Sequence, residues 1–129
     1  MKFVLTVGAI LVASMIGLHT ILQNGSLLKY LDTHPDPGKV PPVEYYIGEG
    51  YYLFGDLQNS ATYYQRVVER YPQSDYSDDA YFNYLQDLDD MNIPRGQMAD
   101  AYLTYIDRFP KGEHVDVVQK RIEYCRNGR

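Results

Sequence analysis

Apolar residues follow two different patterns along this chain of 129 residues. From Phe3 to Leu22 there are twenty residues without a charged side chain. Four polar residues interrupt this run: Thr6, Ser14, His19 and Thr20. From Val43 onward, apolar residues recur every three or four positions, which is typical of helices that bury one face. The two patterns predict an apolar N-terminal helix followed by an all-α domain.

Four apolar stripes, separated by glycine or proline, predict four amphipathic helices. They consist of Val43, Ile47, Gly50 or Tyr51, and Phe54; of Leu57, Ala61, Tyr64, Val68 and Tyr71; of Ala80, Tyr84, Leu88 and Met91; and of Met98, Tyr102, Tyr105 and Phe109. Ser77 is expected to cap the third helix. A fifth helix is predicted over 113–127, with Val115, Val118, Ile122 and Cys125 on its apolar side. We expect two antiparallel helix pairs, with the fifth helix covering the open end of the stack.

The two predicted pairs repeat one motif. Tyr64 lies eight residues before Pro72, and Tyr102 lies eight residues before Pro110. Self-similarity at a period of 30 to 40 residues indicates a helical-repeat protein. Tyr64 and Tyr102 are therefore expected to be equivalent, largely buried core residues.

The first copy resembles a tetratricopeptide repeat. The residues that carry the resemblance are Ile47, Gly48, Tyr51, Tyr64 and Pro72. The copy departs from the family at Glu44, where tryptophan is usual, and at Ser60 and Val67, where alanine is usual. The join from Tyr71 to Ala80 is similar to that of envelope-associated repeat proteins of bacteria, such as outer-membrane assembly lipoproteins and cell-division coordinators. The resemblance covers about half of the chain and implies a short domain of two helix hairpins and a capping helix that holds other proteins.

Proline divides the chain into three predicted parts. Four prolines fall between residues 35 and 42, where they are expected to prevent helix formation and to favour a stiff, extended chain. The expected organisation is therefore a transmembrane anchor over 1–31, a proline-rich linker over 32–42 and the helical domain over 43–129.

The N-terminal apolar run is as long as a bilayer's hydrocarbon core is thick, about 30 Å when helical. A cleaved signal peptide would need a shorter run and a small-x-small exit, and Val12-Ala13-Ser14 lies in the middle of the run. A lipoprotein signal would need a cysteine just after the run, yet Cys125 is the only cysteine. An uncleaved anchor in the cytoplasmic (inner) membrane fits best. Lys2 favours a cytoplasmic N-terminus, which would leave the repeats on the extracytoplasmic, periplasmic side.

Small residues recur every four positions in the anchor, at Ala9, Ala13 and Gly17. They lie on one side of a helix, where small residues allow a second membrane helix to approach closely. Such residues are also common in membrane helices generally. The stripe is a candidate site for helix packing.

Charge and residue types exclude several functions. Residues 43–129 contain nine basic and fifteen acidic side chains, and such an acidic surface is a poor match for nucleic acid. His19, His34 and His114 lie in separate contexts, and neither His34 nor His114 has a metal-ligand partner three or four residues away. No cofactor, metal or small-molecule substrate is expected. Catalytic pairs of residues and glycine loops for phosphate are missing, which argues against an enzyme.

Three aspartates lie near the end of the third predicted helix, where negatively charged side chains are unfavourable. Asp87, Asp89 and Asp90 lie where the helix dipole disfavours anions. We interpret them, together with Tyr81 and Tyr84, as a candidate surface for a basic partner. The alternative is an ordinary solvated acidic face.

The sequence as a whole predicts a membrane-anchored adaptor or accessory subunit that mediates protein–protein interaction in a larger membrane or envelope assembly. The alternative is a secreted or periplasmic repeat module, released by signal cleavage, that binds a peptide or protein client.

Overall fold

The structure is a computed structural model that describes residues 1–128. In these residues it contains seven α-helices and no β-strand, which confirms the all-α prediction. The chain divides into two compact units, Met1–Pro35 and Asp36–Arg129. The two units are described separately.

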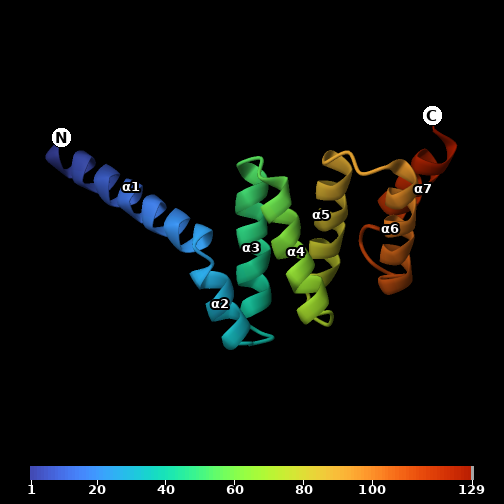
Figure 1. Ribbon diagram of the computed structural model, residues 1–129, viewed down its shortest axis with the longest axis horizontal. Helices are drawn as coiled ribbons and strands as arrows, with labels where there is room; N and C mark the ends of the chain where they lie inside the picture. The colour runs from blue at the N-terminus through green and yellow to red at the C-terminus, as the bar shows by residue number, and fades with distance from the viewer. Residues whose placement is uncertain (129) are drawn as a thin grey trace. The chain divides into compact units, whose positions relative to one another are not determined.

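The first unit consists of helix α1, Lys2–Gln23, and helix α2, Ser26–Thr33 (Figure 1). Helix α1 has no buried residue, and its most apolar window of 18 residues has a mean hydropathy of 2.0. The hydroxyls of Thr6, Ser14 and Thr20 donate to the carbonyl four residues earlier, at 2.8–2.9 Å. These hydroxyls need no partner outside the helix. Among the described helices α1 alone is long and apolar enough to cross a membrane, a property that signal sequences share.

The prediction of an extended linker over 32–42 is wrong at both ends. Asp32 and Thr33 belong to α2, and α3 begins at Val40 with Pro41 and Pro42 in its first turn. Proline fits there because the first N–H groups of a helix have no partner within it. Residues 34–39 remain between the two helices. They contain a turn, in which Asp36 Oδ1 accepts the N–H groups of residues 38 and 39 at 2.9 and 3.1 Å.

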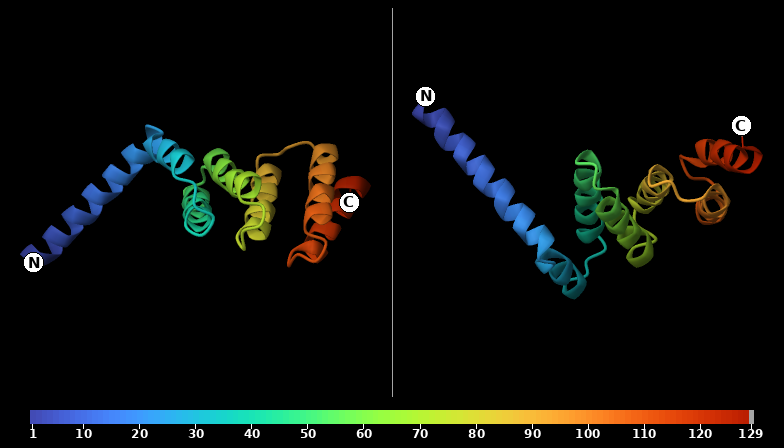
Figure 2. Two further views of the ribbon diagram at one scale, coloured as in Figure 1. Left: turned by 90° about the horizontal axis from the view of Figure 1, so that it is seen from below. Right: turned by 45° about the horizontal axis from the view of Figure 1, so that its top comes forward.

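The described part of the second unit contains five helices. They run alternately up and down (Figure 1) and follow one another in chain order along the stack (Figure 2). They are α3, Val40–Leu53; α4, Leu57–Arg70; α5, Ser77–Asp90; α6, Arg95–Arg108; and α7, Val115–Asn127. Helix α4 packs against both α3 and α5, and α7 packs against α6. The unit thus has the two predicted antiparallel pairs, α3–α4 and α5–α6, with a final helix on the second.

Both pairs turn at the same kind of helix end. Gly55 follows α3 with φ 76°, and Asn92 follows α5 with φ 60°. After each left-handed residue, the next N–H returns to the carbonyl five residues earlier, from Asp56 to Tyr51 and from Ile93 to Leu88. This is a Schellman motif. The predicted cap of the third helix is wrong by one residue, because Tyr76 is the N-cap and Ser77 lies buried in the first turn.

Tyr64 and Tyr102 lie at the centre of the core, and each is 1% exposed, as predicted. The core runs through α4, α5 and α6 and reaches α7 at Val118 and Ile122, and α3 packs against it through the partly buried Tyr45. The other members are Val67, Val68, Ala80, Tyr81, Phe82, Leu85, Met98 and Tyr105. The shared core makes the second unit one packed stack of helices rather than two independent hairpins.

Candidate protein-binding surface

The residues predicted to bind a partner do not form one exposed patch. Asp87 is 1% exposed and Tyr81 is 8% exposed, so neither is available to a partner. Asp89 accepts the Tyr102 hydroxyl at 3.1 Å and lies 3.7 Å from an Arg121 nitrogen. Of the three aspartates, Asp90 alone is exposed. The expectation of a solvent-facing cluster is wrong because α5 is a middle helix that packs against both α4 and α6.

Asp87 is instead a buried carboxyl group. Its pKa is raised to about 6, mainly by burial and to a smaller extent by the charges of Asp90 and Glu49, while the nearby Ser60 hydroxyl acts in the opposite direction. Within residues 1–128, neither carboxyl oxygen of Asp87 reaches a hydrogen-bond partner. Burial of the charged form is unfavourable without such partners. Asp87 is therefore a source of pH-dependent stability rather than a contact residue.

Tyr84, the fifth predicted residue, is half-buried and stacks on Tyr81 with ring centroids 6.1 Å apart. Its role as an aromatic anchor stays a prediction.

The first helices of the two pairs are joined by a polar junction. Glu49 Oε1 on α3 accepts the Tyr64 hydroxyl at 2.6 Å and the Asn83 side-chain amide of α5 at 2.9 Å. The same amide donates to the Tyr45 hydroxyl at 3.2 Å. Burial and the Glu49 charge raise the pKa of Tyr45 to about 12, so this hydroxyl stays protonated at neutral pH. The junction fixes the spacing of α3 and α5 at the surface they share.

Three tyrosine rings lie beside this junction. Tyr45 contacts Tyr46 and Tyr76 with ring centroids 5.3 Å apart in each case, and Tyr46 and Tyr76 lie 6.0 Å apart. Tyr46 is 61% exposed. Asp79 lies close enough for its charge to contribute to the raised pKa of Tyr45. We call the surface made by Tyr45, Tyr46, Glu49, Tyr76, Asp79 and Asn83 the tyrosine–acid face.

Two hollows lie on the second unit. One, of about 260 Å³, borders the tyrosine–acid face at Tyr76. It is lined by Pro37, Gly38, Pro42, Gln73, Ser74, Asp75 and Tyr76. Its prolines and its aromatic ring extend that face toward the start of α3.

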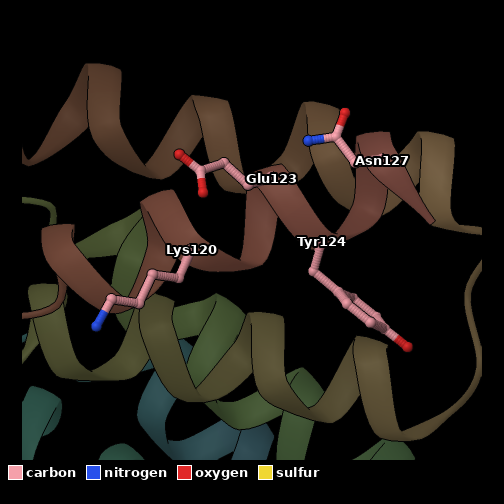
Figure 3. Close-up of a pocket in the computed structure, with 4 residues that line it drawn as sticks. All are labelled: Lys120, Glu123, Tyr124 and Asn127. Carbon is pink, nitrogen blue, oxygen red and sulfur yellow. The ribbon is translucent and has the colours of Figure 1, made fainter. Parts of the chain in front are cut away.

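The other hollow, of about 610 Å³, is lined by four residues of α7: Lys120, Glu123, Tyr124 and Asn127 (Figure 3). In this view Glu123 and Asn127 lie on one side of the helix, and Tyr124 extends on the other. The guanidinium of Arg95 lies 4.8 Å from the centre of the Tyr124 ring. The hollow is the outer surface of the terminal helix, which fits a capping role better than a binding site.

Three possible metal ligands, which the sequence analysis did not connect, come together at the start of α5. They are Asp79, Glu113 and His114, and their ligand atoms all lie within 4.8 Å of one another. The spacing rule applied to the sequence looks only three or four residues away. It does not find partners that meet through the fold.

The small-residue stripe Ala9, Ala13 and Gly17 is exposed on α1. A side-chain carbon added at Gly17 would meet no atom within 4 Å. The stripe is thus accessible within its own unit, and its packing against another membrane helix stays a prediction.

Comparison with known proteins supports the repeat. Residues 43–74 match the family model described as Tetratricopeptide repeat, and this segment covers most of α3, all of α4 and the turn that follows. No curated protein and no solved structure matches the chain. The match supports a tetratricopeptide-like first helix pair and, with it, a role in protein–protein interaction.

Proposed function

We propose that this protein is a membrane-anchored adaptor or accessory subunit that holds a basic segment of a partner protein on the tyrosine–acid face. The observation that carries the proposal is the junction of Glu49, Asn83 and Tyr45, which links the first helices of both pairs beside the exposed ring of Tyr46. The tetratricopeptide match supports a protein partner.

The chemistry of the face favours a basic partner. Its charged members are the carboxylates Glu49 and Asp79, and the domain over 43–129 has a net charge of −6 from nine basic and fifteen acidic side chains. Tyrosine rings attract lysine and arginine through cation–π contacts. Aromatic residues with a polar tip are also frequent anchors at interfaces. A lysine- or arginine-rich segment would therefore meet complementary charge and rings together.

The anchor part of the proposal rests on α1. A helix of 22 residues is about 33 Å long, enough to span the hydrocarbon core, and its hydroxyls are satisfied internally. Lys2 favours the arrangement with the repeats on the extracytoplasmic side of the cytoplasmic membrane. With the resemblance at Tyr71–Ala80, this favours an envelope assembly as the setting.

Partner contact is tested in cells with a photo-reactive phenylalanine analogue at Tyr46. We expect it to form a covalent product with a partner protein, because Tyr46 is the most exposed ring of the face. The same analogue at Thr62, an exposed residue of α4, is the matched control. Equal products at both positions, or none at Tyr46, would contradict the proposal.

Attachment is tested separately by the intact mass of the native protein and by carbonate extraction of membranes. An uncleaved, carbonate-resistant chain supports the anchor. A mature form that begins near residue 15 to 26 would establish the secreted alternative.

A further inference from the structure

We infer that Asp79, Glu113 and His114 form a binding site for a divalent transition-metal ion, where the first turn of α5 meets the segment before α7. Each residue offers one ligand atom, and these atoms all lie within 4.8 Å of one another. Metal–ligand bonds to nitrogen and oxygen are about 2.0 to 2.2 Å long, so atoms that share one ion lie up to about 4.4 Å apart. The three side chains need to move only slightly to reach one ion.

The imidazole of His114 is already held in position. Its ring stacks on Phe82 with centroids 4.0 Å apart and planes inclined by 1°. Its Nε2 atom lies 2.7 Å from Asp79 Oδ1. Ligands of one tetrahedral ion are about 3.3 Å apart, so replacing the shared proton by a metal ion requires an opening of about 0.6 Å. Asp79 allows this movement because its side chain is 47% exposed.

The backbone before α7 is fixed by groups that stay outside the ligand set. The Glu113 N–H donates to Asp78 Oδ2 at 3.2 Å, and the His114 N–H donates to the Tyr105 hydroxyl at 3.3 Å. The Tyr105 hydroxyl in turn donates to the other oxygen of Asp78. At Gly112 an added side-chain carbon would lie 2.8 Å from Asp78 Oδ2, so this approach requires glycine. Asp78 therefore orients the loop while its neighbour Asp79 remains available as a ligand.

The ligand types indicate a transition metal. Imidazole nitrogen is a preferred ligand of zinc, copper, iron and nickel, whereas calcium and magnesium prefer oxygen ligands alone. One nitrogen and two carboxylates provide three protein ligands, which leaves at least one position for water or another donor. A bound ion would connect α5 to the loop before α7 through residues that are 34 positions apart. It would stabilise the folded state by mass action. The site shares Asp79 with the tyrosine–acid face, but its stabilising role does not require the proposed partner.

The test uses the full chain in detergent micelles and Zn²⁺ as the probe. Calorimetric titration should show one Zn²⁺ per chain, and excess Zn²⁺ should raise the midpoint of thermal unfolding, whereas Mg²⁺ should not. The variants Asp79→Asn, Glu113→Gln and His114→Phe should each weaken Zn²⁺ binding by about tenfold or more. His114→Phe retains an aromatic ring against Phe82 and removes the ring nitrogens, and with them the contact to Asp79.

Two matched controls should bind Zn²⁺ as the parent does. Asp90→Asn changes an exposed carboxylate on the same helix, and His34→Gln changes an exposed histidine outside the site. Unchanged affinity in His114→Phe, or no binding to the parent at about 1 mM Zn²⁺, would overturn the inference. If a ligand variant fails to fold, ¹⁵N NMR of the parent decides. Zn²⁺ should then shift the His114 ring nitrogen resonances, and unchanged His114 resonances would equally overturn it.

Discussion

The two helix pairs have helices of equal length, yet they pack at different separations. The backbones of α3 and α4 lie close together along the pair, whereas the backbones of α5 and α6 lie farther apart. The ninth residue of α3 is Gly48, and the ninth residue of α5 is Leu85. A side-chain carbon at Gly48 would lie 2.9 Å from the ring of Tyr64, so the closeness of the first pair requires glycine there.

The distance between the two helices of a pair decides which side chains pack between them. In the second pair, Tyr81 and Phe82 of α5 contact Tyr105 of α6. In the first pair, the buried Glu44 accepts two hydrogen bonds from Arg66 on its Oε1 atom, at 2.9 and 2.7 Å. Both pairs also have tyrosine contacts between their helices, but the narrow pair alone of the two has a buried glutamate–arginine ion pair among the described residues. In the wide pair, tyrosine hydroxyls of α6 donate to the carboxylates of Asp78 and Asp89 on α5. The segment that matches the family ends at residue 74, before the wide pair begins.

Truncation of the two equivalent core tyrosines has the largest expected effect. Tyr64→Ala and Tyr102→Ala should each lower the free energy of unfolding by about 3 to 5 kcal/mol, because each removes a buried ring from the shared core. Urea unfolding of the full chain in detergent measures the loss. Similar losses at both sites would show that Tyr64 and Tyr102 occupy equivalent positions in the two helix pairs. A loss below about 1 kcal/mol at both sites would mean that the register is wrong.

The charged contact of the narrow pair is tested by Arg66→Met. Removal of one partner leaves Glu44 buried without its guanidinium, which should lower the free energy of unfolding by about 3 kcal/mol or more. The double variant Glu44→Met/Arg66→Met should recover most of that loss, because it removes the buried carboxylate together with its guanidinium. The measurement is a double-mutant cycle by urea unfolding. Recovery of less than half would show that the ion pair itself stabilises α3 against α4.

Helix separation is tested by paired glycine variants in α3. Gly48→Ala should destabilise the domain by about 1 to 3 kcal/mol, because the new methyl group would overlap the Tyr64 ring. Gly50→Ala is the matched control, since an added carbon there meets no atom within 4 Å. It should stabilise the helix by about 0.5 to 1 kcal/mol. The midpoint of thermal unfolding reports both changes. Equal effects of the two variants would contradict the explanation by close approach.

Substitution of Asp87, the buried carboxyl group of α5, has the smallest expected effect on the free energy of unfolding. The size of this effect depends on pH. The pKa of Asp87 is raised from 3.8 to about 6 in the folded state, so ionisation opposes folding. Stability should therefore fall as the pH rises from about 4 to about 6 and then stay low. Asp87→Asn should remove this decline and raise stability above pH 6 by roughly 1 to 2 kcal/mol. Asp100→Asn, on an exposed site of α6, is the control and should preserve the decline.

Sequence reasoning predicted the helix pairs, the buried tyrosines and the final helix, because these follow from local periodicity and the repeated tyrosine–proline spacing. It misplaced Asp87 and Tyr81, because periodicity identifies one buried face and α5 has two covered faces. It excluded helix at Pro41 and Pro42 by treating these two prolines as helix interior residues, although they lie in the first turn of α3. The meeting of Asp79 with His114 follows from the turn between α6 and α7, and no local pattern reports it.

The tyrosine–acid face is tested most directly by selecting binders from a random peptide library displayed on phage, with the full chain in detergent as the target. Selected peptides should be enriched in lysine and arginine, and their binding should weaken as salt rises. Tyr46→Ala and Asp79→Asn should each reduce binding at least fivefold, whereas Thr62→Ala on α4 should leave it unchanged. Enrichment of acidic or purely apolar peptides, or equal binding by all three variants, would contradict the account.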